Sequence, residues 1–231
     1  MFKRAKKYIA KFIETILLDR YDKSAYHSQY GQDYYILRHF NFKKEGFFID
    51  IGAFDGVTFS NTKSLEDLGW KGICIEPNPD MYEKVCSSRK CVSYNVALTQ
   101  KEEEKDFVKI QGACAVLSGI KEEYHPSHIE RIKTEINKVG GNIDTIKVKG
   151  ITFDSLMADF QDINTIDYIS IDTEGNEFKI LKSIDFSKYD IRVLSIENNY
   201  KDPEIQRFMK NAGYKCAIRL GCDEIYIKNC F

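Results

Sequence analysis

The chain has 231 residues, 43% of them hydrophobic and 30% charged, a length typical of one domain with a continuous core. Its 34 basic residues are balanced by 35 acidic ones, which excludes a protein that binds nucleic acid through a large basic surface. With only 4 prolines and no run of about 18 apolar residues, we expect neither extensive disorder nor a membrane-spanning helix. A soluble single-domain protein without a nucleic-acid partner is therefore predicted.

Residues 1–27 form a basic N-terminal extension with the pattern of an amphipathic helix. Residues 1–20 hold six basic and two acidic side chains, a net charge of +4, and their apolar residues recur every three or four positions: Phe2, Ala5, Ile9, Phe12 and Ile16. Such a helix either lies on an anionic membrane or partner surface, or packs on the domain or on another subunit of a homo-oligomer. We expect it to precede one domain over residues 28–231.

Residues 46–96 alternate between short apolar runs and helical segments. The runs 47–51, 72–76 and 92–96 are predicted as strands, and the segments 61–68 and 80–87 as helices. Continuous apolar strands that alternate with helices are typical of a parallel sheet covered on both faces.

The middle of the chain departs from this pattern. A strand is expected over 105–110, a loop of small residues over 111–119, and a polar helical stretch, interrupted by Pro126, over 120–139. An edge strand over 144–148 follows, and Thr152 is placed to cap a short helix over 153–159.

The alternation returns in the last third of the chain. Strands are predicted over 167–171 and 193–197, and helices over 177–184 and 203–211. Only three residues separate two final strands, 214–220 and 224–228, so these strands pair in antiparallel fashion. We predict an α/β fold with a mostly parallel seven-stranded sheet that ends in an antiparallel hairpin, with helices on both faces.

The seven cysteines carry information about the compartment. They lie at positions 74, 86, 91, 114, 216, 222 and 230, an odd number without a Cys-x-x-Cys pair. A disulfide framework or a zinc site usually has tighter, regular spacing. We therefore expect reduced thiols and, because no signal peptide is visible at the N-terminus, a cytoplasmic protein.

Ligands of open α/β sheets bind beyond the carboxyl ends of the strands. The first strand is followed by a turn with two acids and two glycines: Asp50, Gly52, Asp55 and Gly56. Phe54 interrupts the Gly-x-Gly-x-x-Gly fingerprint of dinucleotide-binding proteins, so the turn does not suit NAD. Its carboxylates suit a cationic ligand such as S-adenosylmethionine; the alternative is a purely structural turn.

Glu76 ends the second predicted strand, 24 residues after Gly52. An acid at this place can accept hydrogen bonds from both ribose hydroxyls of an adenosine-containing cofactor. Pro77 and Asn78 follow directly, where they would line the adenine. The alternative is that Glu76 only stabilises the next helix through the helix dipole.

Acidic residues also follow two later strands. The run DTEGNE over residues 172–177 holds three acids, and a carboxylate there can position the cofactor ammonium, bind a divalent cation or act as a general base. Glu197 and Asn198 end the neighbouring strand, so Asp172, Glu197 and Asn198 form an all-oxygen set suited to Mg²⁺ or Mn²⁺. The alternative is helix capping by Asp172 and Thr173 beside a solvated loop.

Several motifs in this order resemble the FkbM-type family of S-adenosylmethionine-dependent methyltransferases. They are FFIDIGAFDGVTFSNTKSLEDLGWKGICIEPNP, NVAL, YISIDTEGNEFKIL and the upstream SQYGQDYYI, and the resemblance covers about residues 28–230. It implies a Rossmann-like class I methyltransferase fold. By position it also implies cofactor contacts at Asp50, Gly52, Asp55, Gly56, Glu76, Gln32 and Asp172.

The resemblance further implies methyl transfer to oxygen, commonly to a hydroxyl of a sugar, glycan or natural product. A hydroxyl is a poor nucleophile at neutral pH, so it needs a base or a metal ion to lose its proton. Candidates for this role are Asp172, Glu174, Glu197, His125 and His128. Residues 111–142 match no motif and are expected to be an insertion that determines substrate specificity.

The sequence thus predicts an O-methyltransferase of a sugar or glycan precursor, such as a nucleotide-linked sugar for surface polysaccharide. S-adenosylmethionine and a Mg²⁺ or Mn²⁺ ion are the expected cofactors. One alternative is methylation of a non-sugar natural product. Others are a nucleotide-sugar dehydrogenase or epimerase, which would need the missing phosphate loop, and a non-catalytic module that binds a partner through the N-terminal helix.

Overall fold

The computed structural model describes residues 23–230, so the predicted N-terminal helix and its membrane or subunit contact lie largely outside the described residues. The main sheet has seven strands in the order β10-β11-β9-β8-β1-β2-β3. Their bounds are β1 Phe47–Ile51, β2 Lys71–Ile75, β3 Val92–Tyr94, β8 Thr165–Ile171, β9 Asp190–Glu197, β10 Tyr214–Leu220 and β11 Asp223–Lys228.

All pairings among β1, β2, β3, β8 and β9 are parallel, whereas β11 runs antiparallel to both β9 and β10. The predicted parallel sheet with a closing antiparallel hairpin is therefore confirmed. Because β1 pairs with both β2 and β8, the carboxyl ends of these three strands meet at one edge of the sheet.

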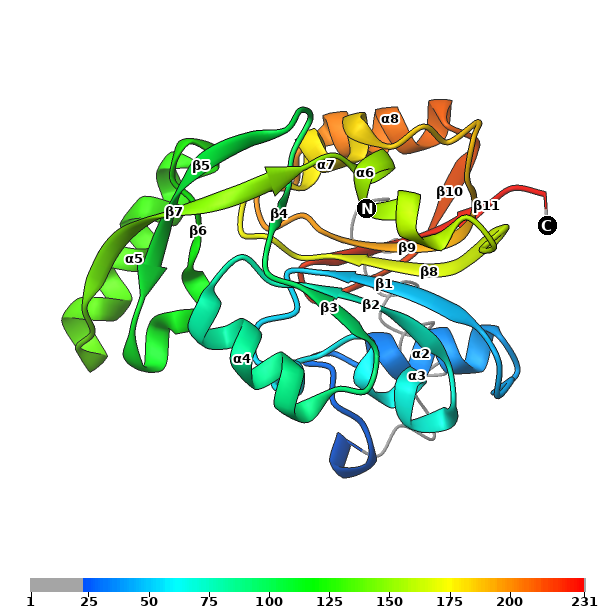
Figure 1. The fold of residues 1–231 in the computed structure, drawn as a ribbon, viewed down its shortest axis with the longest axis horizontal. Coiled ribbons are helices and arrows are strands. Elements are labelled where there is room, and N and C mark those ends of the chain that lie inside the picture. The colour runs from blue at the N-terminus through cyan, green and yellow to red at the C-terminus, as the bar shows by residue number, and fades with distance from the viewer. Residues whose placement is uncertain (1–22, 231) are drawn as a thin grey trace, which may run out of the picture.

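Helices cover both faces of the main sheet (Figure 1). Successive strand residues point to opposite faces, so Ile49 and Phe48 of β1 belong to two different cores, one on each face of the sheet. Each core is completed by its own group of three helices. The first group is α6 (Phe153–Met157), α7 (Glu177–Ser183) and α8 (Pro203–Asn211); the second is α2 (Gln32–His39), α3 (Lys63–Leu68) and α4 (Pro79–Ser88).

A second sheet stands beside the main one, at the left of Figure 1. Its strands have the order β4-β7-β5-β6, with bounds β4 Ala97–Leu98, β5 Glu103–Ile110, β6 Gly119–Ile120 and β7 Ile143–Ile151. The helix α5 (Pro126–Val139) packs against it through Ile132, in a small core with Val108 and Ile110. The segment 111–142, predicted to determine specificity, lies within this unit.

One local prediction for this unit is confirmed and another differs from the structure. Strand β7 pairs with β5 over residues 143–150 but with β4 only at Gly150 and Ile151, so residues 144–148 have a neighbouring strand on one side, as predicted for an edge strand. The helix predicted over 120–139 begins only at Pro126, whose ring suits the first helical turn. Short 3-10 helices occupy Lys23–Ala25, Gly112–Leu117, Lys121–Glu123 and Ala158–Phe160.

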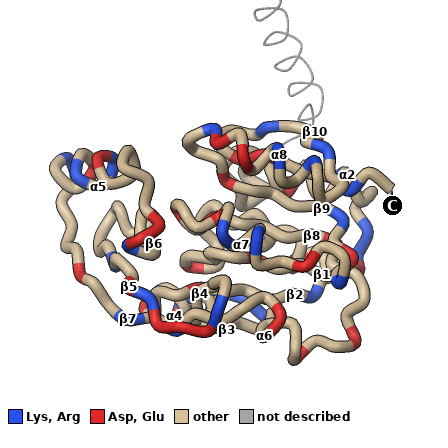
Figure 2. The backbone as a smooth tube through the Cα atoms, turned by 90° about the horizontal axis from the view of Figure 1, so that it is seen from above, with Lys and Arg blue, Asp and Glu red and all other residues tan. Residues whose placement is uncertain are grey.

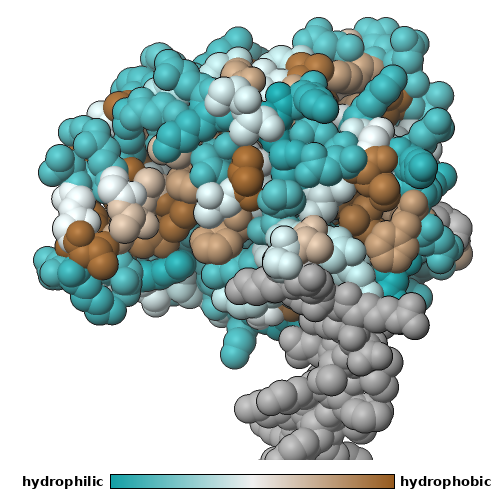
Figure 3. All heavy atoms as spheres, turned by 90° about the horizontal axis from the view of Figure 1, so that it is seen from below, coloured by the Kyte–Doolittle hydropathy of each residue, from teal (hydrophilic) through white to brown (hydrophobic). Residues whose placement is uncertain are grey.

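The surface is mixed in charge and polarity. Lysines and arginines alternate with acids along most elements, including α5 (Figure 2), and apolar side chains lie in small groups among hydrophilic ones on the face shown in Figure 3. Within residues 23–230, no helix is both long and apolar enough to cross a membrane.

The predicted cap of α6 is confirmed, because the Thr152 hydroxyl accepts the backbone N–H of Ser155 at 3.1 Å.

Candidate functional site

A cavity of ≈260 Å³ lies where the carboxyl ends of the parallel strands face the second sheet. Gly52, Glu76 and Asp172 line it from the main sheet, and Phe107 and Arg131 line it from the second sheet and α5. Residues from both units therefore enclose one space, as expected for a ligand site at strand ends.

The turn after β1 requires glycine at position 52. Gly52 has φ +89°, and a Cβ atom there would lie 1.8 Å from the carbonyl oxygen of Asp172. Its N–H donates to the carbonyl of Ile75 at 2.9 Å, which holds the turn against β2. The backbone of residue 52 consequently lies open to the cavity, with no side chain between the two.

Asp55 and Gly56, two predicted cofactor residues, lie outside the cavity lining. The Asp55 carboxylate accepts the backbone N–H groups of Val57 and Thr58 and the Thr58 hydroxyl, at 2.9, 2.7 and 2.7 Å. Although partial burial raises the pKa of Asp55, these bonds lower it below the ordinary value overall. A Cβ atom at Gly56 would lie 2.7 Å from Ser88 Oγ, so this residue allows the loop to pack on α4. Both residues shape the loop.

Glu76 is buried just beyond β2 and lines the cavity. Its two carboxylate oxygens accept the backbone N–H groups of Phe54 and Asn78, each at 2.8 Å. Burial raises the pKa of Glu76 to about 8 despite these two bonds. Each oxygen keeps one acceptor site for a ligand hydroxyl. Pro77 and Asn78 line the cavity beside it, as the predicted adenine contacts require.

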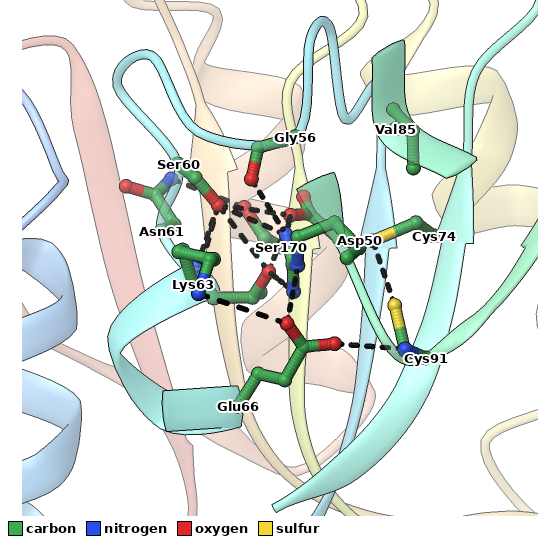
Figure 4. A network of polar contacts seen from close by, with 12 residues as sticks. Asp50, Gly56, Ser60, Asn61, Lys63, Glu66, Cys74, Val85, Cys91 and Ser170 are labelled. Carbon is green, nitrogen blue, oxygen red and sulfur yellow. Dashed lines mark hydrogen bonds and ion pairs between the residues drawn. The ribbon is translucent and has the colours of Figure 1, made fainter. Parts of the chain in front are cut away.

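Asp50 is part of a buried network around Arg89 (Figure 4). The Arg89 side chain is fully buried at the end of α4, with Nη1 3.7 Å from Asp50 Oδ2 and Nε 3.0 Å from Glu66 Oε2. It also donates to the Gly56 carbonyl at 3.1 Å and the Thr62 hydroxyl at 2.9 Å. Burial raises the pKa of Asp50, although the charge of Arg89 and hydrogen bonds oppose the shift. Asp50 lines the cavity, whereas Arg89 lies outside the lining and contacts the Asp50 carboxylate.

Three acids form a cluster at the ends of β8 and β9, which we call the acid trio: Asp172, Glu174 and Glu197. One oxygen of each lies within 4.8 Å of the others, and all three residues line the cavity. Burial, followed by the neighbouring carboxylates, raises the pKa of Asp172 and Glu197 well above their ordinary values. Burial also raises the pKa of Glu174 to about 7. Such a cluster binds a cation or shares protons.

The structure does not bring Asn198 into this group. Its amide oxygen accepts the backbone N–H of Asp202 at 2.7 Å, and its amide nitrogen donates to the Asp202 carbonyl at 3.1 Å. These bonds form the turn before α8, outside the cavity lining. Asn199 instead lines the cavity and donates to Glu197 Oε1 at 2.6 Å. Asn198 is therefore replaced by Glu174 in the predicted set of oxygen ligands.

Neither of the two predicted histidines lines the cavity; His125 is exposed and His128 is buried. His128 is buried, with Nε2 3.1 Å from the Leu117 carbonyl and Nδ1 3.2 Å from Glu174 Oε2. Burial lowers the pKa of His128. His125 caps α5 by accepting the N–H of Ser127, and its ring stacks on Tyr200 with centroids 4.1 Å apart. His128 thus contacts Glu174, whereas His125 holds the second unit against the loop after β9.

Gln32, the first residue of α2, lines the cavity and is bonded to Asp223, a residue that the sequence did not indicate. Its amide nitrogen donates to Asp223 Oδ2 at 2.8 Å, and both residues line the cavity. Asp223 begins β11 directly opposite Glu197, and burial raises its pKa. Asp223 follows the hairpin turn Gly221–Cys222 and belongs to no recognisable sequence motif. It comes close to Glu197 only because β11 pairs with β9 in the folded sheet.

Two exposed aromatic residues also line the cavity, Tyr30 at 41% and Phe59 at 52% relative exposure. A bridge between Ser28 and Phe59 joins the two segments. The Tyr30 ring packs against Gly221, where a Cβ atom would lie 2.2 Å from the ring. Phe59 has φ +59°, a conformation rare for a bulky side chain, which points to a constraint at a functional place.

One family model and several solved structures are similar to this chain. The Methyltransferase FkbM domain matches residues 50–216. No curated protein matches the chain. Among solved structures, the METTL16 methyltransferase domain is similar with a TM-score of 0.45 and 8% identity, covering 86% of this chain and 66% of that chain.

Two further structures are similar at 12% identity. For the Methanococcus jannaschii fibrillarin pre-rRNA processing protein, the TM-score is 0.43, with 81% of this chain and 68% of that chain covered. For precorrin-6y C5,15-methyltransferase from Geobacter metallireducens, the TM-score is 0.40, with 84% of this chain and 85% of that chain covered. The FkbM domain matches well over half of the chain, and the main sheet has the expected parallel strands and antiparallel hairpin, so the chain belongs to the FkbM family of class I S-adenosylmethionine-dependent methyltransferases.

Proposed function

We propose that this methyltransferase transfers the methyl group of S-adenosylmethionine to a hydroxyl of a sugar or glycan precursor, a nucleotide-linked sugar included. The observation that carries the proposal is the composition of the cavity. The same space is lined by Glu76, which can hold a ribose, by the acid trio, which can activate a hydroxyl, and by two exposed aromatic rings.

The cofactor half of the cavity is formed by the segments after β1 and β2. The open backbone at Gly52 allows a close approach, and Glu76 offers acceptors for the ribose hydroxyls. Acidic groups from several strand ends favour the sulfonium and ammonium charges of S-adenosylmethionine. Gln32 and Asp50 contribute to this lining, whereas Asp55 and Gly56 act on it through the loop.

The acceptor half contains the acid trio and the aromatic pair. Methyl transfer is an in-line displacement, so the acceptor oxygen must be held about 3 Å from the methyl carbon. A carboxylate with a raised pKa, such as Glu174 or Glu197, can take the hydroxyl proton as the bond forms. The rings of Tyr30 and Phe59 can pack on the apolar face of a pyranose. A small, fully polar acceptor has no such face, so the two rings favour a sugar.

A divalent ion, Mg²⁺ or Mn²⁺, fits the acid trio. Three carboxylate oxygens within 4.8 Å are hard ligands of the kind these ions prefer, and a cation would offset the repulsion that raises the pKa of Asp172 and Glu197. When bound, such an ion would lower the pKa of an acceptor hydroxyl. Asp172, Glu174 and Glu197 would hold it.

The test uses the purified full chain with labelled S-adenosylmethionine and a panel of nucleoside-diphosphate hexoses. Glu197→Gln should lower turnover about 100-fold, the typical loss for a general base, and leave the affinity for S-adenosylhomocysteine within about twofold. Glu204→Gln, an exposed change on α8, is the matched control and should keep full turnover. Normal turnover of Glu197→Gln would refute its role.

A separate experiment tests the metal by measuring Mn²⁺ binding with electron paramagnetic resonance. Wild-type protein should bind one ion and Glu174→Gln should bind it at least about tenfold more weakly, because one of three charged ligands is lost. Turnover that survives complete chelation would remove the ion from the reaction and leave the carboxylates as bases.

The rival acceptor is a hydroxyl of a non-sugar natural product, which would give the same cofactor affinity with a different acceptor panel. A contact of residues 1–27 with a membrane or a second subunit, and a cytoplasmic location, stay predictions from the sequence.

A further inference from the structure

Two cysteines outside the cavity lie in contact. The sulfur atoms of Cys74 and Cys91 are 3.3 Å apart (Figure 4). Cys74 lies in β2 opposite Ser93 of β3, and Cys91 is two residues before Ser93, on the same face. We propose that Cys74 and Cys91 form a modification site, a dithiol that oxidises to an intramolecular disulfide and so couples the redox state to the cofactor site.

The two thiols differ in access. Cys74 is buried in the core, whereas Cys91 is half-buried and lies just before β3. The hydrogen bond between the two thiols, together with burial, raises the pKa of the Cys74 thiol well above its ordinary value. Cys91 is therefore the thiol that an oxidant reaches first, and Cys74 is the resolving thiol next to it.

The reaction balances with a low-molecular-weight disulfide as the oxidant. The Cys91 thiolate attacks this disulfide, forms a mixed disulfide and releases the first small thiol. The Cys74 thiol loses its proton and attacks the Cys91 sulfur, which expels the second small thiol. Two protein thiols are oxidised and one small disulfide is reduced to two thiols. The sulfur atoms need to approach by only roughly 1 Å, since a disulfide bond is about 2.05 Å long.

The disulfide would join the two ends of a segment that carries Glu76 and α4. Next to it, the backbone N–H of Cys91 donates to Glu66 Oε1 at 2.8 Å, and Glu66 Oε2 accepts Arg89 Nε at 3.0 Å. Arg89 in turn faces Asp50 at 3.7 Å. Movement of Cys91 toward β2 therefore disturbs the network that supports the cavity wall. This consequence rests on the proposed cofactor contacts, whereas the oxidation itself does not.

The first experiment maps the bond in the full chain after treatment with oxidised glutathione. Trypsin cuts after Lys71, Lys84, Arg89, Lys90 and Lys101, so Cys74 lies in peptide 72–84, Cys86 in 85–89 and Cys91 in 91–101. Mass spectrometry without reduction should find 72–84 joined to 91–101, and Cys86 in a separate peptide. Free Cys74 and Cys91, or a bond from Cys91 to Cys86 or to a second chain, would overturn the proposal.

The second experiment measures the affinity for S-adenosylhomocysteine by calorimetry. Oxidation should raise the dissociation constant about threefold or more, and a dithiol reductant should restore it. Cys91→Ser, with Cys91→Ala as a second variant, should abolish the response, and the exposed Cys86→Ser is the matched control that keeps it. An unchanged dissociation constant in protein with the mapped bond would refute the coupling. Failure of the reduced protein to bind S-adenosylhomocysteine would instead refute the cofactor site.

Discussion

Replacement of Glu76 by glutamine tests how the cofactor is held. The carboxylate accepts two backbone N–H groups at 2.8 Å, from Phe54 and Asn78. Glutamine keeps one acceptor oxygen and turns the other into a donor, so one backbone N–H and one ribose hydroxyl lose their acceptor. At a pH above about 8, where Glu76 is ionised, a hydrogen bond to its charged carboxylate contributes about 1.5–3 kcal/mol, so the dissociation constant for S-adenosylhomocysteine should rise about 10- to 150-fold.

The assay is calorimetric titration of Glu76→Gln, with the exposed Glu83→Gln on α4 as the matched control. Thermal unfolding of both variants shows whether the fold is intact. A dissociation constant within about twofold of wild type in a folded Glu76→Gln protein would refute the role of Glu76 in binding the ribose.

The same variant gives a pH prediction with a defined sign. Burial raises the pKa of Glu76 from 4.5 to about 8, so the folded state binds this proton more tightly than the unfolded state. Its contribution to stability is full below pH 4.5 and is lost as the pH rises through about 8. The unfolding free energy of wild type minus that of Glu76→Gln should therefore fall across this window, by at most about 1.4 kcal/mol per pH unit. A constant difference would contradict the raised pKa.

Three further substitutions test separate parts of the site. Gly52→Ala adds a Cβ atom 1.8 Å from the Asp172 carbonyl oxygen at φ +89°, so urea denaturation should show a loss of about 2–5 kcal/mol; a loss below about 1 kcal/mol would contradict the close approach. Arg89→Lys keeps the charge but loses the guanidinium fork, and we expect a loss of about 2–3 kcal/mol in the same assay, with unchanged stability as the contrary result. Tyr30→Ala and Phe59→Ala should raise the KM for a sugar acceptor about 2- to 12-fold without weakening S-adenosylhomocysteine binding, and an effect on the cofactor alone would place the rings elsewhere.

The main sheet could be predicted from the sequence because its strands are short, apolar and separated by clear helical segments. Ile49 and Ile73, for example, stand in runs that are buried throughout. Residues at the ends of these strands, such as Glu76 and Asp172, were found for the same reason, since strand ends meet at one edge.

Other parts depended on contacts that are distant in sequence. Asp223 joins the cavity only because β11 lies beside β9, and Arg89 reaches Asp50 only through the packing of α4. Asn198 and Asn199 are equivalent in composition, and the turn before α8 decides which of them faces Glu197. The second sheet was missed as a unit because β4 and β6 have two residues each, too short for a periodic pattern.

The most direct test of the account is the identity of the methylated product. The full chain is incubated with labelled S-adenosylmethionine and two panels, nucleoside-diphosphate hexoses and non-sugar hydroxyl compounds, and products are identified by mass spectrometry and nuclear magnetic resonance. We predict a base-stable methyl ether on a sugar hydroxyl, lost in Glu197→Gln. Transfer only to the non-sugar panel, or a base-labile methyl ester, would contradict the proposed function.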